Sequence, residues 1–239
     1  MAERRERTSL LFYRSLLHPC PYLPGRFERR VLTDLADLPD PTPAFGHLTS
    51  AGFRRSLSIA YRPVCPTCTA CVPVRIPVGR FQPSTTQRRL VRRNADLSVA
   101  LEASIATDEQ YALFQHYQAS RHAGGDMATM AMSDYRSMVE DSPVDTALLT
   151  LRTQTGALVA VCLVDRSDDG LSAVYSFFDC QDPSRSLGAH LILALVNVCR
   201  ASGLDYVYLG YWIEGSAKMQ YKSRYRPLQR LDDDGWVDL

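Results

Sequence analysis

The chain has 239 residues, of which 46% are apolar and 22% are charged, and its formal net charge is +1. This composition excludes a largely disordered protein and is sufficient for one sizeable core or two small ones. The longest purely apolar stretch, Ala157 to Val164, is too short for the roughly 20 residues that cross a bilayer, so we expect no membrane partner.

The first predicted strand follows a Pro-rich loop at 38–43. Residues 56–61 alternate polar and apolar side chains with the period of a half-buried strand, and Arg62-Pro63 ends it. A second strand is predicted over 72–78. Because a short cysteine-containing turn separates the two strands, we expect a hairpin-like unit whose loop is large enough for a metal ion.

The second half of the chain contains seven further elements. Thr107 is expected to cap a helix, because Gln110 stands three residues later as in a capping box. The turn residues at 167–170 join two strands in a hairpin. The order of helix, helix, three strands, helix and strand is the one found in N-acetyltransferase-like (GNAT) folds. The predicted ranges are 107–122, 130–139, 148–151, 158–164, 171–178, 186–201 and 206–213.

Charge is distributed unevenly along the chain. The window from Pro41 to Ala95 contains nine arginines and no Asp or Glu, and a local positive field of this kind suits phosphate binding. Of the 27 basic residues 25 are Arg, and the two lysines are Lys218 and Lys222. Because the chain otherwise uses Arg, each of the two Lys residues is a candidate for a role that needs an ammonium group. The alternative is that the two lysines occur there by chance.

Seven cysteines are an odd number for a chain of this length, which argues against a disulfide framework. With no secretory signal pattern at the start, reduced thiols and a cytoplasmic location are expected. Cys65, Cys68 and Cys71 recur at intervals of three, and Cys20 is a candidate fourth ligand. Four thiolates suit either tetrahedral Zn²⁺ or an iron–sulfur cluster, whereas the alternative is a set of buried or idle thiols. No organic cofactor is expected.

Four arginines within residues 87–94 recur at the spacing of one helix face, with Leu90 and Val91 facing inward. A solvated surface helix is the alternative, but the absence of acidic neighbours favours contact with a tRNA backbone. The candidate tRNA-binding residues are Arg88, Arg89, Arg92 and Arg93.

The segment 209–227 combines aromatic and basic side chains. Lys218 and Lys222 are four residues apart and are expected to project from one helical face. The cations suit phosphates or a substrate carboxylate, and the aromatic rings suit stacking on a terminal adenine. The alternative is an aromatic core edge. The aromatic residues concerned are Tyr211, Trp212, Tyr221 and Tyr225.

Ten short segments, taken in order, resemble the bacterial aspartate/glutamate leucyltransferases over nearly the whole chain. The last segment is also similar to the C-terminal motif of eukaryotic arginyltransferases. Leu23 stands where those relatives carry a second early Cys. The segments that carry the resemblance are 18–20, 52–56, 61–63, 72–76, 87–94, 121–122, 125–127, 172–179, 186–188 and 209–227.

The resemblance implies an α+β fold of two GNAT-like halves, with mainly antiparallel mixed sheets flanked by helices, divided as 1–98 and 99–239. It also implies transfer of leucine from Leu-tRNA to the α-amine of proteins with N-terminal Asp or Glu, which marks them for N-degron proteolysis. Arginine as the transferred residue stays an alternative, and so does a non-catalytic tRNA-binding protein with a Cys-ligated structural metal.

The implied reaction is aminolysis of an activated ester, so positioning and oxyanion stabilisation are expected to provide most of the acceleration. Asp179, at the end of the strand predicted over 171–178, is the candidate base, with a turn cap as the equal alternative. An anionic acceptor needs a fixed cation in the pocket, and the candidates are Arg75, Lys218 and Lys222.

Overall fold

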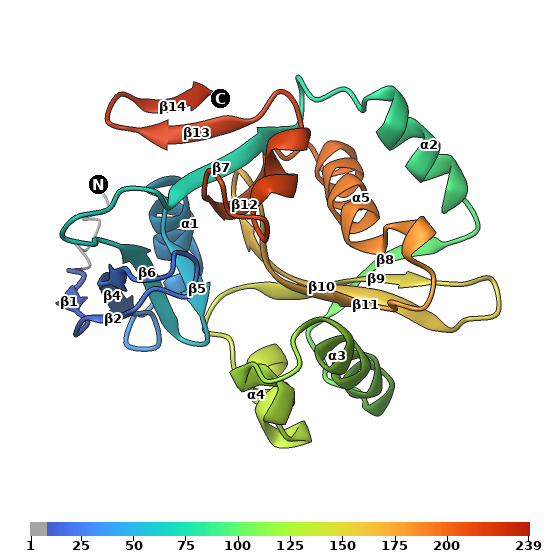
Figure 1. Cartoon of the computed structure of the whole chain (residues 1–239), viewed down its shortest axis with the longest axis horizontal. Helices are drawn as coiled ribbons and strands as arrows, with labels where there is room; N and C mark the ends of the chain where they lie inside the picture. The colour runs from blue at the N-terminus through green and yellow to red at the C-terminus, as the bar shows by residue number, and fades with distance from the viewer. Residues whose placement is uncertain (1–8) are drawn as a thin grey trace, which may run out of the picture.

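The computed structural model describes residues 9–239, so the basic start of the chain at 1–8 lies outside the described residues. Within 9–239 no helix combines the length and the apolar character that a membrane crossing requires. A large sheet of eight strands dominates the fold, with a four-stranded sheet beside it (Figure 1).

The large sheet has the strand order β14-β13-β7-β12-β11-β10-β9-β8. All of its neighbouring strands are antiparallel except β11 and β12, which are parallel. This arrangement confirms the expected α+β class with mainly antiparallel, mixed sheets. Its strands are β7 (Val72–Pro77), β8 (Ser98–Ala103), β9 (Thr146–Arg152), β10 (Leu158–Ser167), β11 (Gly170–Phe178), β12 (Tyr206–Trp212), β13 (Gln229–Asp232) and β14 (Gly235–Asp238).

Helices cover both faces of this sheet (Figure 1). Side chains alternate between the faces of a strand, so β10 contributes Cys162 to one core and Leu163 to the other. The apolar helix α5 lies over the first core with α2 beside it, and α3 and α4 cover the second. The helices are α2 (Thr85–Arg93), α3 (Asp108–Arg121), α4 (Met132–Glu140) and α5 (Leu187–Ala201), with 3₁₀ turns η1 (Asp126–Thr129), η2 (Pro183–Arg185) and η3 (Gln220–Arg224).

The smaller sheet has the order β1-β4-β6-β5 and packs on helix α1. Its small core includes Phe45 of α1 and Ala60 of β6, and also Val144 from the second half of the chain. The elements are β1 (Tyr13–Arg14), β4 (Arg30–Asp34), α1 (Pro41–Ser50), β5 (Arg54–Ser56) and β6 (Ile59–Pro63), with a separate pair β2 (His18–Pro19) and β3 (Phe27–Glu28).

The seven elements predicted for the second half are all present in the predicted order, and Ser84 and Thr107 form capping boxes on α2 and α3. The expected hairpin across the cysteine turn is wrong, because β6 lies in the small sheet and β7 in the large one. The alternating segment is two short strands with a turn at Leu57, whose φ is +53°.

The expected boundary at residue 98 does not follow the sheets. Strand β7 precedes that boundary, yet it lies between β12 and β13 of the large sheet. The division into 1–98 and 99–239 stays a prediction, and the first segment contributes directly to the sheet of the second.

Candidate active site

The parallel strands β11 and β12 separate part-way along the large sheet. Their pairing covers three residue pairs and ends at Ser172 and Tyr208. Beyond that point β11 continues beside β10 and β12 beside β7, so a gap opens between the two central strands. This gap is the candidate active site.

Two cations from other segments lie in this gap. Arg54 of β5 donates from Nη2 to the carbonyls of Ala173 (3.0 Å) and Val174 (2.8 Å) on β11. Its Nη1 donates to the carbonyl of Leu209 on β12 (3.4 Å). Lys222 of η3 donates from Nζ to the carbonyl of Tyr211, also on β12, at 2.5 Å. The acceptors that strand separation exposes are thereby satisfied by positively charged donors.

Lys222 is only 3% exposed. Burial lowers the pKa of its ammonium well below the usual value, and the nearby charge of Arg54 lowers it further, whereas Cys71 acts in the opposite direction. This finding corrects the expectation that Lys218 and Lys222 share one helical face: η3 is a short 3₁₀ turn, and Lys218 before it is exposed.

We expect the buried ammonium to make stability rise with pH. The folded state holds the Lys222 proton less tightly than the unfolded state, so the free energy of unfolding increases as pH rises towards 10.5. Replacing Lys222 with Met should remove this contribution, which is at most about 1.4 kcal/mol per pH unit. Urea unfolding of wild type, Lys222→Met and the exposed control Lys218→Met at pH values from 7 upward measures the free energy of unfolding of each protein. If the free energy of unfolding changed with pH equally in Lys222→Met and wild type, the prediction would be wrong.

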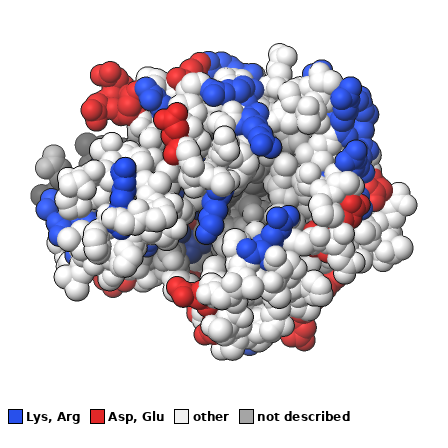
Figure 2. Space-filling model, in the orientation of Figure 1, with Lys and Arg blue, Asp and Glu red and all other residues white. Residues whose placement is uncertain are grey.

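In the orientation of Figure 1, the surface of the molecule has a hollow near its centre with Lys and Arg side chains around it (Figure 2).

Aromatic side chains are also close to the gap between β11 and β12. Tyr117 of α3 packs on Phe178 of β11 with ring centroids 4.9 Å apart, and Gln118 donates to the Tyr175 hydroxyl at 2.6 Å. The 42% exposure of Tyr221 leaves its ring accessible, as its expected role requires.

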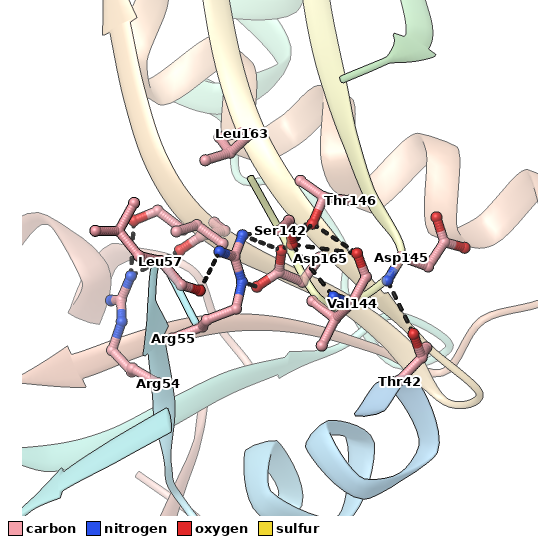
Figure 3. A network of polar contacts seen from close by, with 12 residues as sticks. Thr42, Arg54, Arg55, Leu57, Ser142, Val144, Asp145, Thr146, Leu163 and Asp165 are labelled. Atoms are coloured by element: carbon pink, nitrogen blue, oxygen red, sulfur yellow. Dashed lines mark hydrogen bonds and ion pairs between the residues drawn. The ribbon is translucent and has the colours of Figure 1, made fainter. Parts of the chain in front are cut away.

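Strand β5 is fixed in this position by a buried ion pair (Figure 3). Arg55 donates to both carboxylate oxygens of Asp165 on β10, at 2.8 and 2.6 Å, and both side chains are 1% exposed. Thr146 also donates to Asp165, and Arg55 donates to the Leu57 carbonyl. Neighbouring strand residues point to opposite sides, so the same strand directs Arg54 into the gap.

The four cysteines singled out by their spacing line one cavity of about 30 Å³ together with Leu23 and Arg26. Burial, with a smaller contribution from the other three cysteines, raises the pKa of Cys71 to about 12. A backbone amide at Ala70 lowers the pKa of Cys68, to which Arg26 also donates at 3.2 Å. The donors are Cys20, Cys65, Cys68 and Cys71.

The convergence of four thiols fits Zn²⁺ or an iron–sulfur cluster in kind. As they are placed, however, no group of three or more Cys, His, Asp or Glu side chains within residues 9–239 is arranged to hold a metal ion.

Arg75 is not placed to read an acidic substrate. It is 8% exposed, its guanidinium stacks on Tyr206 at 3.5 Å and Trp236 at 4.3 Å, and it donates to Gln229 and Tyr208. Because two of its donors bond within the fold and its guanidinium is buried against aromatic rings, Arg75 holds the β13–β14 hairpin on the sheet instead. This corrects its predicted contact with the acceptor.

Two of the four aromatic candidates belong to the core, as the alternative reading proposed. Tyr211 is 3% exposed and donates to the carbonyls of Gly52 and Tyr61. Tyr225 is equally buried and donates to the Ala189 carbonyl, and Trp212 packs partly against the same core. Stacking by Tyr211 or Tyr225 on an adenine is excluded by this burial.

Asp179 follows β11 directly, and its Oδ1 accepts a hydrogen bond from the Gln181 amide at 2.9 Å. The turn cap proposed as the alternative is therefore present, and the base assignment stays a prediction. Lys218 is exposed and has no hydrogen bond or ion pair with any other residue in the described range.

The arginine helix is confirmed as α2, with all four arginines exposed and Leu90 and Val91 packed on the core. Between α2 and α5 lies a groove of about 290 Å³. Its floor includes Phe81 and Leu193, and its rim carries Arg88, Arg92 and Arg200.

Comparison with known proteins agrees with this geometry. The family model described as arginine-tRNA-protein transferase, C terminus, matches residues 109–232, and the N-terminus model matches 18–89. The aspartate/glutamate leucyltransferase of Gluconacetobacter diazotrophicus is 52% identical over 98% of this chain and 89% of its own length. Its namesake in Granulibacter bethesdensis is 51% identical over 95% of this chain and 85% of its own length. The chain belongs to the aspartate/glutamate leucyltransferase family. It is therefore an aminoacyltransferase, as the resemblance implied.

Among solved structures, L-PGS from Bacillus licheniformis covers 70% of this chain and 58% of its own, with a TM-score of 0.51 and 12% identity. At this identity the similarity concerns the fold alone, and it agrees with the expected GNAT-like architecture. A second GNAT-like half is not confirmed.

The sequence did not reveal the role of Arg54. It lies within segment 52–56, which carries the resemblance, but nothing local distinguishes it from Arg55 beside it. The only signal was its place in the acid-free window, which contains no partner of opposite charge.

Proposed function

We propose that this protein transfers leucine from Leu-tRNA to the α-amine of proteins whose first residue is Asp or Glu. Membership of the family supports the reaction class. The observation that carries the proposal is the gap between β11 and β12, where Arg54 and Lys222 supply positively charged donors. The permanent positive charge of Arg54 favours the oxyanion that develops when an ester carbonyl is attacked.

In the proposed reaction the acceptor nitrogen forms a bond to the leucyl carbonyl carbon, and the ester bond to the tRNA ribose oxygen breaks. The amine loses a proton, and the departing ribose oxygen gains one. Asp179 remains the proposed base, because it follows β11 at the gap and its Oδ2 has no hydrogen-bond partner among residues 9–239. No covalent enzyme intermediate is required.

Lys218 is the proposed cation for the acceptor's acidic side chain. It is exposed, and its segment lies between β12 and η3, which contributes Lys222 to the gap. Arg75 is not retained in this role because its guanidinium is enclosed by Tyr206 and Trp236.

The tRNA is proposed to follow α2. Arg88, Arg89, Arg92 and Arg93 are exposed on a helix with no acidic residue, and phosphate contacts of this kind are independent of base sequence. The groove between α2 and α5 adds apolar surface below these charges, which suits a nucleotide that leaves the helical stack.

We also propose a structural metal at Cys20, Cys65, Cys68 and Cys71. A bound metal would stabilise thiolates and tie the β2–β3 pair to the segment before β7. Elemental analysis of protein purified without oxygen should find zinc or iron in wild type and much less in Cys68→Ser. Metal-free protein with the same melting temperature in both would contradict the proposal.

One assay separates the proposed activity from its rivals. Purified protein should attach leucine from Leu-tRNA to peptides that begin with Asp or Glu and leave a peptide that begins with Lys unmodified. Transfer from Arg-tRNA instead would establish arginine as the donated residue. Binding of tRNA whether or not it is aminoacylated, with no product, would establish a non-catalytic binding protein.

A further inference from the structure

We propose that Arg54 is a positioning residue for the transfer reaction, because its guanidinium replaces the interstrand hydrogen bonds that β11 and β12 lose and so sets the width of the gap. This inference rests on the proposed function for its catalytic consequence. Its structural part concerns contacts among the described residues alone.

The first support is the set of acceptors that Arg54 satisfies. In a regular strand the carbonyls of successive residues such as Ala173 and Val174 point to opposite neighbours, but the pairing of β11 with β10 shifts register between Leu163 and Val164, opposite these two residues. Beyond Ser172 and Tyr208, β11 and β12 no longer pair with each other. Here the carbonyls of Ala173, Val174 and Leu209 all accept from a single guanidinium, which reaches across the gap from β5. A planar, permanently charged fork can bond to two strands at once, whereas an ammonium is a compact point charge.

The second support is the number of donors that remain. A two-pronged bond to a carboxylate uses two adjacent guanidinium nitrogens, and Nη2 takes part in each such arrangement. Both protons of Nη2 are committed to the carbonyls of Ala173 and Val174. In this geometry Arg54 therefore cannot form a bidentate ion pair with an acidic acceptor. Its role differs from the one proposed for Lys218, which is to bind the acceptor's acidic side chain.

The third support is Gly210, which makes room for the guanidinium. A Cβ built on Gly210 would overlap the end of the Arg54 side chain. Gly210 also has a φ of +70°, in the left-handed region that favours glycine, and the pairing of β12 with β7 shifts register between Tyr208 and Gly210. The backbone of β12 is therefore irregular at Gly210, beside the Arg54 guanidinium.

Lys222 completes the same edge. It bonds to the carbonyl of Tyr211, two residues beyond Leu209 on β12. Both cations therefore donate to carbonyls of β12 beyond the point where its pairing with β11 ends. Of the two, only Arg54 also donates to carbonyls of β11.

The first experiment measures leucine transfer by Arg54→Ala and Arg54→Lys. We expect kcat to fall about 100-fold in Arg54→Ala, the effect of misplacing reacting groups by about 1 Å, while binding of Leu-tRNA in a filter assay stays within about threefold of wild type. Arg54→Lys should recover little. Millimolar guanidinium chloride should restore part of the activity to Arg54→Ala and none to Arg54→Lys. The control is Arg166→Ala, a partly exposed arginine at the far end of β10.

The second experiment tests the fit between Arg54 and Gly210. Gly210→Ala should displace the guanidinium and lower kcat by roughly 10- to 100-fold, and guanidinium chloride should not restore it. In the double variant Arg54→Ala/Gly210→Ala the overlap is absent and only the backbone strain of alanine at φ +70° remains, so the fall in kcat should be clearly smaller than the product of the two single effects. Multiplying effects in the double variant, or wild-type kcat in Arg54→Ala, would overturn the proposal.

Amide hydrogen exchange tests the structural part independently of any activity. In Arg54→Ala the amides of 173–175 and 209–211 should exchange faster than in wild type, while those of α3 should be unchanged. Unchanged exchange at both strands would overturn the proposal. If wild-type protein transfers no amino acid, the proposed function fails, whereas faster exchange at the two strands would still support Arg54 as the link between them.

Discussion

Replacing Asp165 with Ala should lower the free energy of unfolding by about 3–5 kcal/mol, because it leaves the Arg55 guanidinium buried without its counter-charge. Both side chains are 1% exposed, and the pair is bidentate. Chemical denaturation at neutral pH measures the loss. Because β5 also carries Arg54, leucine transfer should fall at temperatures where the protein remains folded.

Two variants make this prediction specific. The double replacement Arg55→Met/Asp165→Leu removes both charges and should recover most of the lost stability. Asp238→Ala breaks the Arg80 ion pair, whose side chains are 53% and 57% exposed, and should change the free energy of unfolding far less than Asp165→Ala does. If Asp165→Ala were no more destabilising than Asp238→Ala, the buried pair would not be what holds β5 in place.

Leucine transfer to peptides that begin with Asp or Glu should fall about 10- to 150-fold in Lys218→Ala. A hydrogen bond to a charged group contributes about 1.5–3 kcal/mol, and the loss should be seen in kcat/KM. Lys218→Arg, which keeps the charge, should retain more activity. Folding should be unaffected because the Lys218 side chain is exposed and bonds to no other described residue.

The matched comparison for this prediction is the acceptor itself. With Lys218→Ala, peptides beginning with Asp and with Asn should become similarly poor acceptors, whereas wild type should prefer Asp strongly. Equal activity of wild type and Lys218→Ala on the Asp peptide would show that a residue other than Lys218 binds the acidic side chain of the acceptor.

Local patterns in the sequence determined much of the fold. The capping box expected at Thr107 and the apolar segment 186–201 predicted helices that the structure contains. These signals depend on residues within one or two turns of each other, so they survive without knowledge of the rest of the chain. The ordered motifs likewise determined the family, which the relatives confirm.

Only the tertiary structure decided what individual cations do. Arg75 and Arg54 lie in the same acid-free window of the sequence, but their burial and partners separate them: Arg75 stacks on aromatic rings, whereas Arg54 bonds to strand carbonyls in a gap. Their partners come from β11, β12, β13 and β14, more than 100 residues along the chain. Solvation and charge at a side chain depend on which distant segments surround it, so the sequence determined which groups were available and the packing of its sheets decided which of them can act.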